Sequence, residues 1–371
     1  MNSFDVVIVG TGIVGAACAA HLTGEGMSVL LLEANDIATG TTATGMGHIV
    51  IMDDSEAQFA LTCYSQKLWK DLAEEMPKNC EFEHCGTIWV AADENEMNEV
   101  RRKKEFYRSH SVETQILDER SLREAEPNLA DGLAGGLLVE SDAVVYQLTA
   151  TRFLIEKAND NGAALRTRTQ VREITDQGVK LGNNETISAG CVINAAGAAA
   201  SDLSPQLNIK KRKGHLIITE RYEGFVWHQL IELGYLKSAH GSEQDSVAFN
   251  VQPRSTGQVL LGSSRQFGSE TRVVDQSILR RMTSRAFEYM PKLRTLAAVR
   301  IWTGFRPATP DNLPYIGKIP GFDNVYAAAG HEGLGITTSL GTAALLADEI
   351  IGRTPSIPAE PYMPSRTHSE H

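Results

Sequence analysis

The sequence predicts an α/β domain built on a parallel sheet, with an α+β domain inserted into it. The first observation is the short apolar run Phe4-Asp5-Val6-Val7-Ile8-Val9, which is typical of a buried strand. The second is that this run leads directly into Gly10-Thr11-Gly12-Ile13-Val14-Gly15 and an alanine-rich helical stretch over 16–26. The third is a later buried strand, Cys191-Val192-Ile193-Asn194-Ala195-Ala196-Gly197, which ends in small residues and returns to the same α/β style.

The glycine motif predicts a phosphate-binding turn. Gly10 allows the tight turn, Gly12 lets a pyrophosphate approach the backbone, and Gly15 lets the helix lie close to the strand. The free N–H groups and positive dipole end of the helix favour an anion there. A second strand over 27–32 ends at Glu33, where a carboxylate accepts hydrogen bonds from a ribose. This context indicates a Rossmann-like dinucleotide site; the alternative is a glycine-rich turn in another α/β fold.

Composition limits the classes of function. A chain of 371 residues accommodates two domains, and 42% hydrophobic with 22% charged residues is ordinary for a soluble globular protein. The net charge of −11 argues against general binding of nucleic acid, whose phosphates it would repel. No apolar run approaches the ~20 residues of a membrane span. The chain enters its first strand at once, so we expect a cytoplasmic location.

The cysteines predict reduced thiols and no metal site. Five cysteines without framework spacing fit free thiols. Cys80 and Cys85 are close enough in sequence to pair, but surface or half-buried thiols fit an expected cytoplasmic chain better. The sequence has no CxxC and no paired-histidine spacing, so we expect no metal and no iron–sulfur cluster.

The order of elements predicts how the two domains share the chain. Helical spacing is seen over 57–76, 94–109, 148–161 and 274–289, and antiparallel hairpins are predicted from strands over 214–220, 246–252 and 258–263. We therefore expect residues 1–55, 146–213 and 304–371 to form the nucleotide-binding domain. Residues 56–145 and 214–303 are expected to form the substrate domain.

Three further stretches are candidates for ligand contacts. Residues 38–47 are small and hydroxyl-bearing, which lets backbone approach a flat ligand; the alternative is a plain flexible loop. His48 follows, either as a structural histidine or near a reacting centre. Residues 330–337 place glycines and His331 ahead of a helix, which again offers free N–H groups. The basic run Lys210-Lys211-Arg212-Lys213 is either a solvated turn, a site for a second anionic cofactor or a partner surface.

Taken together, these motifs resemble the D-amino-acid oxidase/glycine oxidase superfamily of flavoenzymes, over essentially the whole chain. The resemblance also rests on the stretch from Gly304-Phe305-Arg306-Pro307 to Pro314-Tyr315-Ile316-Gly317. It implies FAD, bound in a Rossmann-like domain of three separated segments, and an antiparallel sheet over the flavin. Some sarcosine oxidases of this type carry a cysteine near the 304–317 motif, and this chain has none there, so we expect FAD bound without a covalent link. The resemblance implies that Arg306 grips the substrate carboxylate, for which a guanidinium is a bidentate, permanently charged partner; the alternative is a structural ion pair. The catalytic candidates are Arg306, His48 and His331. The cofactor-binding candidates are Gly10, Gly12, Ile13, Val14, Gly15, Glu33, Ala34, Thr41, Thr42, Gly45, Met46, Gly47, Val171, Ala196, Gly197, Gly304, Arg306, Gly330, His331, Gly333, Leu334, Gly335, Ile336 and Thr337.

Within the superfamily, residues 45–55 and 85–92 look like the catalytic β subunits of multi-subunit dehydrogenases, closest to the D-hydroxyproline dehydrogenase type. That resemblance implies oxidation of a small amino or imino acid by hydride transfer from its α carbon to flavin N5. A single GxGxxG argues against a second nicotinamide site, so the electrons pass to oxygen or to a partner subunit. FMN at a subunit interface near residues 210–213 is a further expectation. The alternatives are the β subunit of an opine (octopine or nopaline) oxidase, a stand-alone glycine or D-amino-acid oxidase, and a non-catalytic flavin-carrying subunit.

Overall fold

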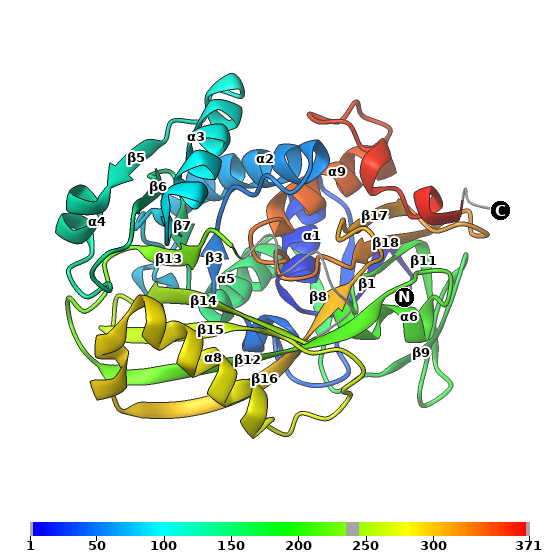
Figure 1. The fold of residues 1–371 in the computed structure, drawn as a ribbon. Coiled ribbons are helices and arrows are strands. Elements are labelled where there is room, and N and C mark those ends of the chain that lie inside the picture. The colour runs from blue at the N-terminus through cyan, green and yellow to red at the C-terminus, as the bar shows by residue number, and fades with distance from the viewer. Residues whose placement is uncertain (1–2, 235–244, 369–371) are drawn as a thin grey trace. The chain divides into compact units, whose positions relative to one another are not determined.

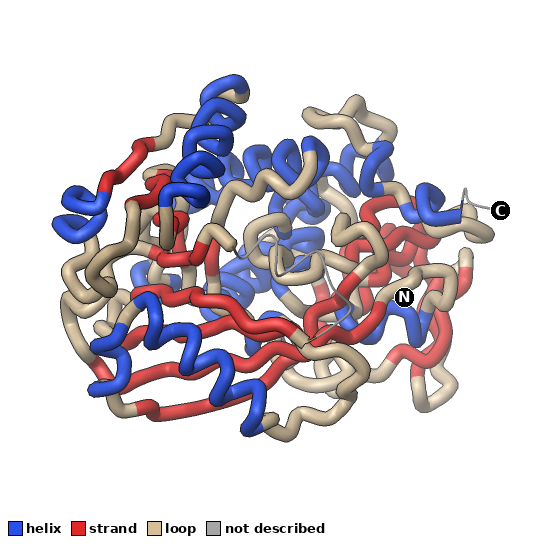
Figure 2. The backbone as a smooth tube through the Cα atoms, viewed as in Figure 1, coloured by secondary structure: helices blue, strands red, loops and turns tan. Residues whose placement is uncertain are grey.

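The computed structural model describes residues 3–234 and 245–368. The chain divides into two compact units, each assembled from separated segments. Unit 1 comprises Met1–Cys80, Tyr146–Lys211 and Phe305–His371, and unit 2 comprises Glu81–Val145 and Arg212–Gly304. Figure 1 shows the elements of both units, and Figure 2 separates their helices from their strands.

Unit 1 is built on a sheet whose central strands are parallel. Within the described residues it has eight strands, in the order β17-β18-β11-β1-β2-β8, with the hairpin of β9 and β10 attached to β11. The pairs β1–β11, β1–β2, β2–β8 and β11–β18 are parallel, whereas β17–β18 is antiparallel. The strands are β1 (Ser3–Val9), β2 (Val29–Leu32), β8 (Ala164–Arg166), β9 (Val171–Thr175), β10 (Gly178–Leu181), β11 (Thr186–Asn194), β17 (Tyr315–Lys318) and β18 (Val325–Ala329). Val6, Val7 and Ile8 of β1 are fully buried, as the apolar run predicts.

Helices cover this sheet with apolar and small residues. The principal helices of unit 1 are α1 (Ile13–Gly24), α2 (Glu56–Ala73), α5 (Gln147–Asp160), α6 (Ala200–Leu203) and α9 (Ser339–Ile351). Helix α1 is buried almost all round because it contacts both α5 and α9. Helix α9 ends at Gly352, whose φ of 72° is the left-handed conformation that a glycine C-cap favours. The layer is therefore fixed by close helix contacts made possible by alanine and glycine.

The boundary expected at residue 55 is wrong, because residues 56–80 belong to unit 1. Helix α2 starts at an N-cap in which Ser55 accepts a hydrogen bond from the Gln58 N–H, and its buried face contacts α9. The Ser65 hydroxyl accepts a hydrogen bond from the Gly341 N–H at 3.2 Å. An amphipathic pattern shows that a helix buries one face, but it does not identify the element that covers that face.

Unit 2 is built on a mostly antiparallel sheet. Within the described residues it has eight strands, in the order β16-β12-β15-β14-β13-β4-β6-β5. The strands β4 and β13 form a parallel pair, which joins the two inserted segments of the chain. The strands are β4 (Thr87–Ala91), β5 (Gln115–Asp118), β6 (Gly135–Val139), β12 (Lys210–Arg221), β13 (Gln229–Glu232), β14 (Ser246–Pro253), β15 (Gln258–Arg265) and β16 (Ala298–Ala308). Two-residue strands are β3 (His48–Ile49) in unit 1 and β7 (Ala143–Val144) in unit 2.

The helices of unit 2 begin at acidic N-caps. They are α3 (Glu94–Ser109), α4 (Glu119–Ala125) and α8 (Gln276–Tyr289). Asp93, Asp118 and Asp275 each accept a backbone hydrogen bond at the start of one helix, and Asp118 forms a full capping box. Helix α8 lies across β14 and β15 (Figure 1) and covers the apolar core of this unit.

The basic run that could have been a turn is part of a strand. Residues 210–213 begin β12, and Lys213 is buried, its ammonium donating to the Val273 carbonyl at 2.5 Å and to the Ser269 hydroxyl at 3.3 Å. Arg212 lies over the Phe267 ring. An FMN site at this run stays a prediction, and Lys213 already has partners within unit 2.

Candidate active site

The glycine motif forms a tight connection in unit 1 that leaves no room for a Cβ at Gly10 or Gly15. Gly10 has φ of 109°, and a Cβ there would lie 2.5 Å from the Ala195 carbonyl oxygen. A Cβ on Gly15 would lie 2.1 Å from the Gly10 carbonyl oxygen. Gly12 is the N-cap of α1 and has no side-chain cap, so the positive end of α1 faces this turn without a carboxylate or hydroxyl of its own. The turn therefore has the form of an anion cradle.

Glu33 is held in place at the end of β2. One carboxylate oxygen accepts hydrogen bonds from the N–H and the hydroxyl of Thr11, both at 3.0 Å. The other oxygen accepts from the Asn35 N–H at 2.9 Å. A carboxylate has about four acceptor positions, so Glu33 retains capacity for a ribose hydroxyl. Thr11, fully buried, was not among the predicted site residues, although it lies inside the glycine motif.

The small-residue loop reaches the start of α1. The Thr42 hydroxyl accepts a hydrogen bond from the Ile13 N–H at 3.0 Å. The Thr41 hydroxyl donates to the Phe305 carbonyl at 2.9 Å, and a Cβ on Gly197 would lie 3.8 Å from the same hydroxyl. The side-chain amide of Gln147 donates to the Gly45 carbonyl at 2.9 Å. The loop thus contacts the start of α1, Gly197 and Phe305.

Residues 330–338 form the second glycine loop, which comes close to the first. A Cβ on Gly335 would lie 4.0 Å from a methyl group of Val14, and one on Gly45 would lie 2.9 Å from a methyl group of Ile336. The indole N–H of Trp69, fully buried, donates to the carbonyls of Ile336 and Thr337. The Thr337 hydroxyl donates to the His48 carbonyl at 2.9 Å. Nothing in the sequence distinguished Trp69 from an ordinary core residue of α2.

Arg306 and His48 both lie beside Gly333 of this loop. A Cβ on Gly333 would lie 3.6 Å from the Arg306 Nε. The His48 Nε2 lies 3.2 Å from the Gly333 carbonyl oxygen. A carbonyl oxygen only accepts, so Nε2 carries the proton and the neutral ring presents Nδ1 as a bare acceptor. This Nδ1 is covered and makes no hydrogen bond within residues 3–234 and 245–368.

Both histidines are neutral near pH 7. Burial lowers the pKa of His48 to about 4, opposed by its hydrogen bond to the Gly333 carbonyl and supported by the Arg306 charge. Burial also lowers the pKa of His331 to about 3. The His331 Nε2 lies 2.9 Å from the Thr342 hydroxyl. Of the two, His48 lies beside Arg306, whereas His331 is fixed between its loop and α9.

The structure brings most predicted site residues together from the three segments of unit 1. Residues 10–15, 41–48, 195–197, 305–306 and 333–337 are linked by the contacts above. Val171 is the first residue of β9 and is buried in the apolar cluster that also holds Val9 and Leu32. Two residues before it, the Thr169 N–H donates to the Glu33 carbonyl at 2.8 Å. Ala34 is exposed after Glu33, and Gly304 is the last residue of unit 2.

These residues fit a bound FAD. The close packing of backbone at Gly10 and Gly15 and the N-terminus of α1 at Gly12 suit a pyrophosphate at the start of α1. The carboxylate of Glu33 suits the ribose, and the unpartnered Nδ1 of His48 marks a covered position that awaits a donor. The site therefore has the form of a dinucleotide-dependent oxidoreductase with a cation for the substrate.

The chain belongs to the family "DAO: FAD dependent oxidoreductase", whose model matches residues 5–349. It is therefore a FAD-dependent oxidoreductase. It is similar to the hydrogen cyanide synthase subunit HcnC of Pseudomonas protegens, with 26% identity over 93% of this chain and 92% of the relative. It is similar to the crystal structure of glycine oxidase from Geobacillus kaustophilus, with a TM-score of 0.88, 25% identity and coverage of 98% and 99% of the two chains. It is also similar to that of L-proline dehydrogenase from P. horikoshii, with a TM-score of 0.88, 25% identity and coverage of 98% and 97%.

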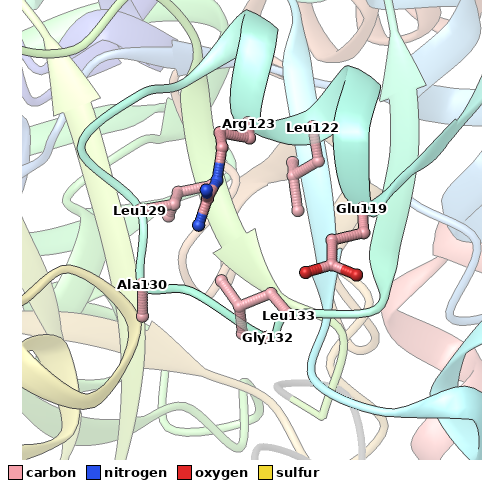
Figure 3. A pocket seen from close by; sticks show the side chains of 7 residues that line it. All are labelled: Glu119, Leu122, Arg123, Leu129, Ala130, Gly132 and Leu133. Atoms are coloured by element: carbon pink, nitrogen blue, oxygen red, sulfur yellow. The ribbon is translucent and has the colours of Figure 1, made fainter.

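Outside this site, the described residues show three further features: their cysteines, the character of their helices and a pocket in unit 2. The five cysteines are free, and within the described chain no three metal-ligating side chains gather. Among the helices that the structure describes, none has the length and apolar character needed to cross a membrane. A small surface pocket lies in unit 2, where Glu119, Leu122 and Arg123 extend from α4 toward the loop over 129–133 (Figure 3). It shares no residue with the site in unit 1.

Proposed function

We propose that the protein oxidises a small cyclic imino acid of the D-hydroxyproline type and passes the electrons to a partner subunit. The observation that carries the proposal is the pairing of a permanent cation, Arg306, with a neutral acceptor, His48, beside one glycine loop. When bound, FAD supplies the chemistry by accepting a hydride from the substrate α carbon. The residues of the chain then have to bind and orient the substrate and exclude water.

Arg306 is proposed to hold the substrate carboxylate. A guanidinium offers two parallel N–H donors to a carboxylate and keeps its charge at every working pH. The contact fixes the position of the α carbon, and fixed geometry is worth several kcal/mol in a two-component reaction, of the order of 7–11 kcal/mol in the best cases. This places Arg306 in binding and positioning.

His48 is proposed to accept a hydrogen bond from the substrate amine. Its Nδ1 carries the lone pair, because Nε2 donates to the Gly333 carbonyl. A pKa of about 4 makes the ring a poor proton acceptor near neutral pH. The amine therefore has to arrive deprotonated, and kcat/KM is expected to rise with pH toward the pKa of the free substrate amine.

The likenesses support the proposal at two points. An L-proline dehydrogenase, an enzyme of a cyclic imino acid, shares the fold over almost the whole chain. The relative HcnC is named as a subunit, which supports transfer of electrons within a hetero-oligomer. We further propose non-covalent FAD and a cytoplasmic location. Flavin that stays on acid-precipitated protein would contradict the first.

The test is anaerobic mixing of the purified holoprotein with a panel, followed by the visible absorbance of the flavin. The panel holds cis-4-hydroxy-D-proline, D-proline, sarcosine, glycine and octopine. Rapid bleaching by the cyclic D-imino acids is expected. Bleaching by octopine alone would move the chain to the opine oxidases, and no bleaching with FAD bound would indicate a flavin-carrying subunit.

Arg306→Met separates substrate binding from scaffolding. The variant should retain FAD, and the substrate concentration for half-maximal bleaching should rise at least about 100-fold, because a charge-assisted pair is lost. Arg353→Met is the matched control, since Arg353 is an exposed partner of Glu25. Equal kinetics for Arg306→Met and the parent would refute the proposal that Arg306 binds the substrate carboxylate.

A stand-alone oxidase is the second candidate, favoured by the likeness to glycine oxidase. It predicts hydrogen peroxide from glycine and oxygen by the isolated chain at a rate close to that with an artificial dye. A subunit that needs its partner should make little peroxide until it is co-expressed with that partner.

A further inference from the structure

The carboxyl-terminal segment of unit 1, red in Figure 1, holds an arginine whose donors are all used. The guanidinium of Arg366 makes five hydrogen bonds, as many as it has N–H groups. Two reach the carboxylate of Asp311, from Nε at 2.7 Å and from Nη2 at 3.0 Å. The other three reach backbone carbonyls, those of Leu313 at 2.7 Å, Tyr362 at 2.8 Å and Met363 at 3.1 Å. One side chain therefore ties the end of the described chain to the loop that contains Asp311 and Leu313.

This arginine is largely buried, and the segment that carries it is anchored. The Arg366 side chain is 14% exposed, and its guanidinium lies 4.4 Å from the centre of the Tyr315 ring, which is fully buried. The hydroxyl of Tyr362, a buried side chain, donates to the Ala57 carbonyl in the first turn of α2 at 2.7 Å. Burial alone would raise the pKa of Asp311, but the hydrogen bonds and charge of Arg366 outweigh it and lower the pKa. The contact is therefore an ordered ion pair and not a loose surface pair.

The loop that Arg366 binds comes directly after the proposed carboxylate-binding residue. Arg306 lies near the end of β16, and Thr309 is the first residue after this strand. The Thr309 hydroxyl donates to the Leu313 carbonyl at 2.8 Å, so this carbonyl accepts from both Thr309 and Arg366. The Leu313 N–H donates to the Asp311 carboxylate at 3.1 Å. These bonds close a turn directly after the strand that carries the proposed substrate cation.

The same turn contacts the second glycine loop. Gly330 has φ of 85°, and a Cβ there would lie 2.5 Å from the Thr309 methyl group and 3.4 Å from the Tyr315 ring. The Glu332 N–H donates to the Pro307 carbonyl at 2.9 Å. The stretch that follows the proposed carboxylate-binding residue is therefore held both by this loop and by the carboxyl-terminal segment.

We propose that Arg366 is a positioning residue, which fixes the direction of the Arg306 guanidinium by holding the turn over 309–313. The inference rests on the proposed function, in which Arg306 binds the substrate carboxylate. Fixed geometry matters because a displacement of about 1 Å in a substrate-positioning group can lower a rate by about 100-fold. The alternative is that Arg366 only stabilises the carboxyl-terminal segment, in which case the folded holoprotein binds substrate equally well without it.

A double-variant cycle separates these two roles. The substrate concentration for half-maximal anaerobic bleaching is measured for the holoproteins of the parent, Arg366→Met, Arg306→Met and the double variant. In Arg366→Met this concentration should rise at least about tenfold with FAD retained, because the substrate carboxylate loses part of a charge-assisted contact. In the double variant it should lie within about twofold of Arg306→Met alone, because Arg366 acts only through Arg306. An unchanged concentration in Arg366→Met, or fold-changes that multiply in the double variant, overturns the inference.

Two further variants guard this test. Arg353→Met is the matched control, because Arg353 also binds one carboxylate through two nitrogens, that of Glu25 at 3.1 and 2.6 Å, but at the exposed end of α9. It should leave the half-maximal concentration within about twofold of the parent, and a rise as large as in Arg366→Met would overturn the inference. Arg366→Lys keeps the charge beside Asp311 without the planar fork, so it should raise the concentration by about threefold. This variant decides the question if Arg366→Met fails to fold, and parent-like binding would then overturn the inference.

Hydrogen exchange distinguishes failure of this inference from failure of the proposed function. Backbone amide exchange is compared between the parent and Arg366→Met holoproteins over 309–313, over 330–335 and, as a reference, over α8. Exchange in the first two segments should accelerate at least about tenfold, with α8 unchanged. If no substrate bleaches the parent flavin, the proposed reaction is refuted and this exchange pattern decides the inference. Equal exchange in both proteins, or the same acceleration in α8, would then show that Arg366 does not hold the turn specifically and would overturn it.

Discussion

Substitution of Gly15 by alanine tests the phosphate cradle most directly. A Cβ at this position would lie 2.1 Å from the Gly10 carbonyl oxygen, and both atoms belong to backbone that cannot rotate away. Real Cβ atoms essentially never approach other atoms closer than 3.0 Å, so the start of α1 has to move by about 1 Å away from the turn. The same movement displaces the N–H groups that would hold the pyrophosphate.

The magnitude follows from those hydrogen bonds. A shift of about 1 Å takes a bond of normal length beyond the useful range, and each charge-assisted bond is worth about 1.5–3 kcal/mol. Loss of one to two such bonds amounts to about 3 kcal/mol, or roughly a 150-fold rise in the Kd for FAD. Overpacking should also lower the free energy of unfolding of the apoprotein by about 1–3 kcal/mol.

The assay is titration of apoprotein with FAD, followed by quenching of flavin fluorescence, together with urea unfolding. Gly24→Ala is the matched control, because Gly24 ends the same helix and a Cβ there meets nothing within 4 Å. It should bind FAD as the parent does and be equally or slightly more stable. If Gly15→Ala bound FAD with the affinity of the control, the cradle would not be at the start of α1.

Three further predictions concern groups that the fold buries. Burial lowers the pKa of His331 to about 3, so the unfolded chain binds the proton at higher pH than the folded protein does. The free energy of unfolding that His331 contributes above pH ~6.5 is therefore lost as the pH falls. Between pH 7 and 5, the free energy of unfolding of His331→Asn should fall by about 2 kcal/mol less than that of the parent in urea unfolding. Glu126 is fully buried and accepts hydrogen bonds from the N–H groups of Trp227 and His228 and from the His228 ring. Glu126→Ala should therefore lower the free energy of unfolding by about 3 kcal/mol in the same assay. A loss equal to that of the exposed control Glu124→Ala would refute this structural role. Trp69→Phe removes the donor to the carbonyls of Ile336 and Thr337 and should weaken FAD binding by about tenfold in fluorescence titration, whereas unchanged affinity would show that the second glycine loop is held without it.

Local patterns predicted the parts of this protein that depend on local physics. The turn at Gly10, the helix after it and the carboxylate at Glu33 follow from residues within one βαβ unit, and the structure places them in one such unit. The role of Arg306 was predicted through the resemblance to the flavoenzyme superfamily and not from local physics. The neutral state of His48 was not, because it depends on burial and on a carbonyl 285 residues away in sequence.

Features made by register or by long-range packing were beyond the sequence patterns. The pairing of Thr87 with Gln229 and of Ile231 with Asn250 is one such feature, because no local pattern determines which strands are neighbours. The place of α2 in unit 1 was missed because its apolar stripe fits a partner in either unit. Thr11 donates to the Glu33 carboxylate and Trp69 to backbone carbonyls of the second glycine loop, and these distant partners left no distinct signal in the residue types.

The division of unit 1 into three segments has a consequence for how the protein is made. Its sheet is complete only when β18 has paired with β11, and the second glycine loop follows β18 directly. A ribosome therefore has to deliver both segments of unit 2 before the cofactor site exists, and a chain truncated after residue 304 lacks Arg306 as well as that loop. Cofactor loading in the cell thus follows synthesis of both inserted segments of unit 2, and it reports that the chain has been made at least as far as the second glycine loop.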